Sequence, residues 1–139
     1  MNARELAEVL TRPDDPAKLV DLMAPDGVVE WPYRPDGVPG VLRGKEEVAA
    51  FVRAAAGSIT FLEYTDVTIH ETTDPEVVIV EYTAQCLVND TGVAFTQRPI
   101  QVIRVREGKI VSLRDYINPL PLIAATGGRV PTPGATPGP

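Results

Sequence analysis

The stretch that decides the fold is residues 106–121, REGKIVSLRDYINPLP, near the end of the chain. Glu107-Gly108 is typical of a turn, and the residues after it alternate like a β-strand. The alternation predicts one face with Val111, Leu113, Asp115 and Ile117, and an opposite face with Ile110, Ser112, Arg114, Tyr116 and Asn118. One carboxylate therefore stands in the middle of an otherwise apolar face.

The position of Asp115 points to acid–base chemistry if that face is buried. Burial disfavours the charged form of a carboxyl group, so the pKa of Asp115 should rise above about 3.9. A carboxyl group tuned upward in an apolar cavity exchanges protons near neutral pH, as a general acid or base must. The alternative is that this face meets solvent or a subunit interface, in which case Asp115 is an ordinary surface charge.

Length and composition predict one globular domain. The chain has 139 residues, of which 44% are apolar, and its net charge is −6. We expect a single domain over residues 1–128 and a Pro/Gly-rich tail over residues 129–139, because RVPTPGATPGP lacks a packing pattern. No basic cluster exceeds two residues, so nucleic acid is not an expected partner.

The expected location is the cytoplasm. Cys86 is the only cysteine, so no internal disulfide can form. The start of the chain carries no apolar run of signal-peptide length, and no segment approaches the length of a membrane span. We therefore expect a soluble protein without a membrane partner.

The first half of the chain reads as helices around one strand. Asp15 is a candidate N-cap, the triplet at residues 25–27 is typical of a turn, and Gly57 is placed to end the longest helix. The strand would place Val29, Trp31 and Tyr33 on one face. The expected elements are helices at residues 3–10, 16–23 and 45–56, a strand at 28–33 and a loop at 34–44.

The second half reads as strands joined by tight turns. Residues 77–88 form the strongest pattern, with an apolar face of Val78, Val80, Tyr82, Ala84, Cys86 and Val88. Strands are also expected at residues 59–72, at residues 93–106 and after the Glu107-Gly108 turn. Residues 89–92 are typical of a hairpin loop. This order predicts an α+β fold: a curved antiparallel sheet that wraps around the long helix as a cone. The open mouth of such a cone suits a small organic ligand.

Several motifs resemble a known superfamily. They are VVEWPY, LRGKEEVAAFV, HETTDPEVVIVE and the ending RPIQVIRVREGKIVSLRDYINPL. Over roughly Leu6 to Gly127 the chain resembles the nuclear-transport-factor-2-like (NTF2-like) superfamily, in particular its SnoaL-like and ketosteroid-isomerase-like enzymes. The phenazine-biosynthesis A/B proteins resemble it most. The resemblance implies a cone-shaped α+β barrel and a homodimer formed through the convex sheet face. It also implies activity without a metal or organic cofactor.

The resemblance separates the possible chemistries residue by residue. The catalytic aspartate of ketosteroid isomerases falls at Trp31 and their oxyanion-hole acid at Gln101, so steroid isomerisation in that form is not expected. The aspartate that ends the last strand of limonene-epoxide-hydrolase-like enzymes matches Asp115. Their Arg-x-Asp motif, however, falls at Tyr82 and Ala84, so the arginine and the second carboxylate are missing here. The phenazine-type enzymes also match Asp115, whereas their helix histidine falls at Phe51.

These comparisons leave a set of candidate site residues. We expect Asp115 to act as the principal acid or base, with Gln101 as a hydrogen-bond donor to a substrate oxygen or as a satisfied buried amide. The substrate-binding candidates, whose alternative role is core packing, are Trp31, Tyr33, Phe51, Tyr82, Leu113 and Ile117. We expect His70 to have an exposed or structural role rather than a catalytic one. We expect Cys86 to pack as a small hydrophobic residue rather than to act as a nucleophile. One histidine and one cysteine supply no metal site.

The sequence therefore predicts an isomerase- or cyclase-like enzyme of specialised metabolism. Its ligand would be a small, apolar, cyclic or polyketide-like molecule, and the chemistry would be proton transfer without a cofactor. A non-catalytic small-molecule-binding protein of the same fold is the alternative. Epoxide hydrolysis of the limonene-epoxide type is third.

Overall fold

The computed structural model describes residues 1–128. The predicted tail, residues 129–139, lies outside the described residues. The helices are α1 (Ala3–Leu10), α2 (Lys18–Leu22), α3 (Gly44–Ser58) and α4 (Leu120–Thr126). The strands are β1 (Met23–Glu30), β2 (Val41–Arg43), β3 (Ile59–Glu71), β4 (Val77–Val88), β5 (Ala94–Gln97), β6 (Ile100–Arg106) and β7 (Lys109–Asp115).

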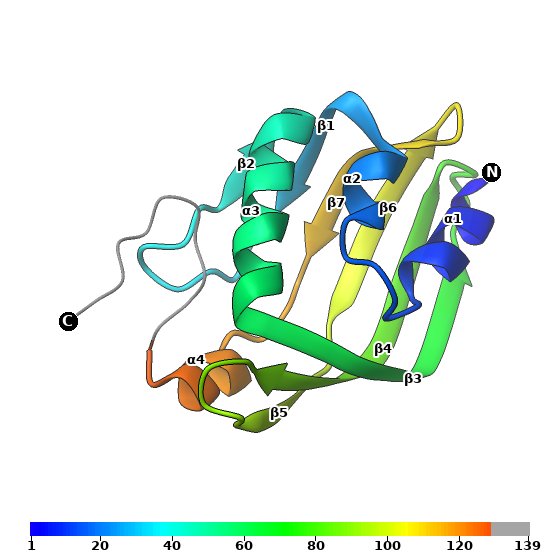
Figure 1. Ribbon diagram of the computed structural model, residues 1–139. Coiled ribbons are helices and arrows are strands. Elements are labelled where there is room, and N and C mark those ends of the chain that lie inside the picture. The colour runs from blue at the N-terminus through cyan, green and yellow to red at the C-terminus, as the bar shows by residue number, and fades with distance from the viewer. Residues whose placement is uncertain (129–139) are drawn as a thin grey trace.

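One curved sheet contains all of these strands. Its order is β2-β1-β7-β6-β4-β3, and β5 pairs with β4 beyond the end of β6. The β3-β4-β6-β7 ladders are antiparallel, as the turn chemistry predicts, whereas β1 runs parallel to β7. Figure 1 shows α1, α2 and α3 lying across one face of the sheet, with α4 beside β5. The expected α+β architecture is therefore confirmed.

Two apolar clusters hold the helices on the sheet. The larger cluster joins α1 and α3 to the sheet around fully buried Leu6, Met23, Val48, Ile103 and Ile110. The smaller cluster contains Ile59, Ala84, Cys86 and Val88, and α4 packs against it through Leu122 and Ala125. The two clusters leave a cavity on the inner face of the sheet.

Local expectations near the first strand were partly wrong. Helix α2 begins at Lys18 with Ala17 at the N-cap position, and Asp15 instead accepts a hydrogen bond from the Ala17 N–H at 2.9 Å. Met23 already belongs to β1. The predicted turn at residues 25–27 is an irregularity within β1, where the register against β7 shifts.

The stretch around Asp115, residues 106–121, also departs from simple alternation. The register between β6 and β7 shifts so that Val105 pairs with Ile110 but Arg104 pairs with Ser112. A bulge of this kind adds one residue, here Val111, to one strand of the pair. The residues before the bulge then point to the opposite face of the sheet from the one that alternation predicts. Ile110 and Leu113 are consequently both buried, although alternation placed them on opposite faces.

Four further boundaries differ from the predictions. The long helix continues through Gly57 to Ser58, and the predicted loop contains β2. The predicted strand at residues 93–106 divides into β5 and β6 at Arg98-Pro99, because proline cannot donate to a ladder. Helix α4 was not predicted at all.

Gly27 should be essential to the packing of β1 on β7. A Cβ atom at this position would lie 2.8 Å from the backbone oxygen of Ile110 and 2.9 Å from Cε of Met23. We predict that Gly27→Ala lowers the free energy of unfolding by about 1–3 kcal/mol, because backbone atoms cannot move aside cheaply. Urea denaturation measures the change.

Gly57 provides the matched control. A Cβ atom there meets nothing within 4 Å, and the residue lies inside α3. Gly57→Ala should raise the free energy of unfolding by about 0.5 kcal/mol, since alanine restricts the unfolded chain. Equal effects of the two substitutions would contradict the packing described at Gly27.

Candidate functional site

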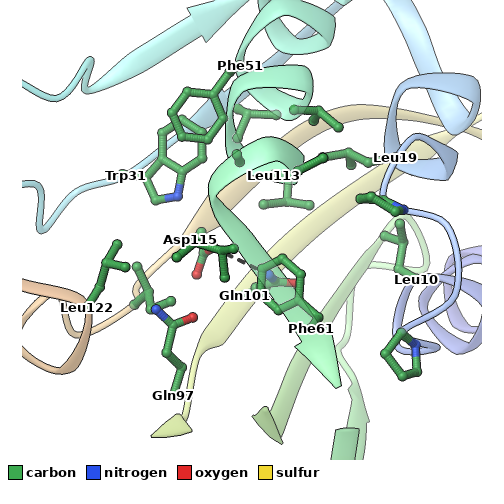
Figure 2. Close-up of a pocket in the computed structure, with 18 of the residues that line it drawn as sticks. Leu10, Leu19, Trp31, Phe51, Phe61, Gln97, Gln101, Leu113, Asp115 and Leu122 are labelled. Atoms are coloured by element: carbon green, nitrogen blue, oxygen red, sulfur yellow. Dashed lines mark hydrogen bonds between the residues drawn. The ribbon is translucent and has the colours of Figure 1, made fainter. Parts of the chain in front are cut away.

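The cavity between the sheet and the helices has a volume of about 460 Å³. Its wall is mostly apolar, and side chains from the sheet, α3, α4 and the loop after β1 contribute to it (Figure 2). All eight residues singled out from the sequence line this cavity: Trp31, Tyr33, Phe51, Tyr82, Gln101, Leu113, Asp115 and Ile117. Their roles toward a ligand remain predictions.

Asp115 lies at the end of β7, opposite Gln101 in the neighbouring strand β6. The Gln101 Nε2 group donates hydrogen bonds to Asp115 Oδ2 at 3.4 Å and to the Tyr82 hydroxyl at 3.3 Å. Asp115 as a residue is half-buried because it borders the cavity, but its Oδ1 atom is shielded from water. Within residues 1–128, Oδ1 is the one buried side-chain oxygen or nitrogen without a hydrogen-bond partner.

Trp31 lines the cavity from the loop just after β1. Its backbone N–H donates to the Gly40 carbonyl at 2.8 Å, which fixes the chain just beyond β1. Its ring packs on Phe51 of α3, with ring centroids 4.7 Å apart. Figure 2 shows the indole nitrogen on the side of the ring that faces Asp115, although the two groups do not reach hydrogen-bonding geometry.

Burial raises the pKa of Asp115 to about 6, against an ordinary value of 3.8. The hydrogen bond from Gln101 and the nearby indole of Trp31 favour the ionised form and lower the pKa, but they do not cancel the cost of losing water. No cation contributes to the shift. Asp115 therefore exists as both acid and base near neutral pH, which is what proton transfer requires.

Two tyrosines, Tyr64 and Tyr82, lie next to the hydrogen-bonded pair of Gln101 and Asp115. Tyr64 and Tyr82 lie with ring centroids 4.6 Å apart. Burial raises the pKa of Tyr64 to about 12 and holds the pKa of Tyr82 well above its usual range. Both hydroxyl groups are therefore neutral and able to donate hydrogen bonds.

Tyr33 differs from the expectation that it shares a strand face with Trp31. Strand β1 ends at Glu30, so Tyr33 lies in the following loop and is 62% exposed. Its ring meets the edge of Tyr116 at a centroid distance of 5.7 Å. The hydroxyl of Tyr116 in turn accepts a hydrogen bond from Arg114 at 3.1 Å. This group lies at the mouth of the cavity rather than on its floor.

Other reactive side chains lie outside this chemistry. The His70 ring contacts Glu81 at 2.6 Å on the half-exposed outer side of β3 and β4, away from the cavity lining. Burial raises the pKa of the Cys86 thiol to about 11, so the thiolate nucleophile is not formed at neutral pH. Across residues 1–128, no three His, Cys, Asp or Glu side chains cluster as a metal site would require. No helix in this range is long and apolar enough to cross a membrane.

Sequence reasoning missed several lining residues, among which Gln97 is a buried polar one. It ends β5, is 8% exposed, and its amide makes no hydrogen bond within the described part of the chain. Gln97 lies four residues before Gln101, which could have placed the two on one face. Pro99 between them obscured that spacing. Phe61 and Tyr64 of β3 and Leu122 of α4 also line the cavity.

A curved sheet with helices over one face, an apolar cavity between them and a buried acid defines a class of small-molecule site. The sequence model of the SnoaL-like domain matches residues 3–113, and the chain belongs to that family. An uncharacterised PhzA/B-like protein of Pseudomonas aeruginosa is 35% identical over 131 residues, which are 92% of each chain.

Solved structures agree with this assignment. A Bacillus subtilis protein named "Putative Isomerase" has a TM-score of 0.82 and 30% identity, covering 93% of this chain and 92% of that chain. A phenazine-biosynthesis-related protein of Pseudomonas aeruginosa has a TM-score of 0.77 and 21% identity, covering 93% and 87%. Proteins with NTF2-like and ketosteroid-isomerase-like folds also match, so the expected fold is confirmed.

The raised pKa of Asp115 predicts a pH-dependent loss of stability. The folded protein holds the proton up to about pH 6 and the unfolded chain only to about pH 4, so stability falls as pH rises between these values. The gap of about 2 pH units corresponds to about 3 kcal/mol, at about 1.4 kcal/mol per unit. Urea denaturation from pH 4 to pH 8 should show this fall in the wild type relative to Asp115→Asn.

The comparison with Asp115→Asn removes the contributions of other titrating groups. Above pH 7 the variant should be the more stable protein, since it buries no charge. A difference between the two proteins that does not change with pH would show that Asp115 is solvated in the folded state.

Proposed function

We propose that this protein is a cofactor-free acid–base enzyme acting on a small, largely apolar, cyclic or polyketide-like molecule. The reaction would be an isomerisation or cyclisation in specialised metabolism, and Asp115 would move the proton. The observation that carries the proposal is a carboxyl group with a pKa of about 6, one oxygen of which has no protein partner, inside an apolar cavity.

Asp115 borders the cavity, so its carboxyl group can reach a ligand there. Oδ2 is held by Gln101, whereas Oδ1 has no protein partner but is covered in the ligand-free protein. A turn of the carboxyl group about its Cβ–Cγ bond would expose an oxygen that takes a proton from a carbon next to a carbonyl group. The electron pair of the broken C–H bond then moves to the carbonyl oxygen as an enolate. Where a carbon–carbon double bond of the ligand is conjugated with the enolate, protonated Asp115 returns the proton to the far carbon of that bond. The double bond then shifts, the carbonyl group is regenerated and the carboxylate is restored.

Gln101 and Tyr82 are placed to stabilise the enolate oxygen. Both lie beside Asp115 on the inner face of β4 and β6, and both carry neutral donor groups. The Gln101 amide would rotate one N–H toward the ligand, and the Tyr82 hydroxyl would donate from the adjacent strand. Loss of one such donor typically costs a factor of about 10² to 10³ in rate.

The names of similar proteins support this chemistry. One similar structure is named "Putative Isomerase", another is named as phenazine-biosynthesis-related, and one relative is named as an uncharacterised PhzA/B-like protein. A non-catalytic binding protein is the second candidate, because Trp31, Phe51 and Tyr82 stand where the resemblance places catalytic partners of the acid. Epoxide hydrolysis lacks support, since within residues 1–128 no arginine and no second carboxyl group contacts Asp115. Dimerisation through the convex sheet face and a cytoplasmic location remain predictions.

The proposed proton transfer can be tested before the natural substrate is known. We predict that the wild-type protein accelerates exchange of the α-protons of β-tetralone, a bicyclic ketone, with deuterium from the solvent. Proton NMR follows the loss of the α-proton signals. The rate should rise with pH through about 6 and then level, because the ionised form of Asp115 is the base.

Two variants separate catalysis from binding. Asp115→Asn should abolish the exchange above background while the affinity for β-tetralone stays within a few-fold, and Gln101→Leu should slow the exchange by about 10² or more. Trp31, the sole tryptophan, lines the cavity, so its fluorescence reports ligand binding in each variant. Binding to the wild-type protein without any acceleration of exchange would favour the non-catalytic candidate.

A further inference from the structure

Gln97 is a buried polar side chain that the proposed chemistry does not use. It is 8% exposed and lies in the wall of the cavity, and its amide has no hydrogen-bond partner within the described residues. Among the described residues Asp115 Oδ1 is the one fully covered unpaired atom, so the Gln97 amide is instead open to the space of the cavity, where a ligand can pair with it. The apolar neighbours in its part of the wall include Phe61 and Leu122.

The strand register fixes where this amide lies relative to the reacting group. Gln97 pairs with Ala84 of β4, and Gln101 pairs with Val80 of the same strand, so both glutamines lie on the inner face. Their Cα atoms are four strand positions apart, which is about 13 Å. Figure 2 shows the Gln97 side chain rising toward the carboxyl group of Asp115, at the end of the cavity where Leu122 lies.

We propose that Gln97 binds a second oxygen of the ligand, at the end of the molecule away from the carbonyl group that reacts at Asp115. This inference rests on the proposed function and narrows its substrate to a fused-ring or extended cyclic ketone with a distal hydroxyl or carbonyl group. A neutral oxygen fits best, because the glutamine amide both donates and accepts and carries no charge. Gln97 is in this sense a specificity-determining residue.

The arrangement gives the inner face of the sheet two separate amides, Gln101 and Gln97, that can each hold one end of a ligand. A ligand held only at Gln101 and Asp115 can rotate about that contact and present different carbons to Oδ1. A second hydrogen bond several ångströms away fixes the orientation and therefore selects the carbon that loses its proton. Ala84, directly opposite Gln97, is small enough to leave the amide open to the cavity.

A pair of probe ketones tests the proposal. The first is β-tetralone, and the second is its derivative with a hydroxyl group on the aromatic ring, at the far end from the ketone. Isothermal titration calorimetry measures both affinities, and quenching of Trp31 confirms binding in the cavity. Gln97→Met keeps the length of the side chain and removes the amide. It should weaken binding of the hydroxy-ketone about 3- to 10-fold and change binding of β-tetralone by less than about twofold.

Gln85→Met is the matched control. Gln85 lies on β4 next to Ala84 but is exposed on the other face, where it accepts a hydrogen bond from Thr96 at 2.9 Å. This variant should leave both affinities at the wild-type value. Gln97→Met should also keep or raise the midpoint of thermal unfolding, since it removes no hydrogen bond of the ligand-free protein.

Three results would overturn the inference. Equal weakening of both ketones, or no weakening of either, would show that Gln97 does not recognise the second oxygen. A clear fall in the unfolding midpoint of Gln97→Met would show that the amide has a structural role instead. Failure of both ketones to bind the wild-type protein would overturn the ligand class and the proposed function together. The first two results leave the proposed role of Asp115 intact.

Discussion

The pairing of Gln101 with Asp115 across β6 and β7 is the constraint on which the site depends. This register places one amide and one carboxyl group side by side at the end of two central strands. Their neighbours in the cavity wall are mostly apolar or aromatic, including Leu113 and the packed pair of Trp31 and Phe51. A carboxyl group in this position keeps a single protein hydrogen bond, so burial outweighs it and the pKa rises.

The rest of the fold keeps that environment apolar without filling it. Helices α1 and α3 pack on one end of the sheet around Leu6, Val48 and Ile103. At the other end, α4 covers the smaller cluster through Leu122. A fully packed core would leave no space for a ligand beside Asp115. A sheet without covering helices would expose the carboxyl group of Asp115 to water. The two separate clusters provide a space of about 460 Å³ between these extremes.

Much of this arrangement follows from periodicity, and the exceptions have physical causes. The strand Val77–Val88 was predicted with its observed bounds, because its alternation is long and rich in β-branched residues. The alternation around Asp115 also identified the cavity-facing carboxyl group. It failed at Val111, since a bulge depends on the pairing partner and leaves no mark in the strand's own pattern. Helix α4 is short, with Pro119 at its N-cap and Pro121 in its first turn, so tertiary packing rather than propensity stabilises it.

The placement of cations supports proton transfer over reactions that need an electrophilic partner. Arg12, Arg34 and Lys18 lie in the cavity wall, but none of them acts on Asp115. Arg12 is exposed, Arg34 donates to the Val38 carbonyl at 2.7 Å, and Lys18 pairs with Asp14 at 2.5 Å. A cation beside Asp115 would favour its ionised form and lower the pKa, which weakens it as a base. With neutral donors alone, the site can stabilise an enolate of modest charge while Asp115 stays able to give the proton back. The same carboxyl group can then act first as base and afterwards as acid, which is the minimum that an isomerisation within one molecule requires.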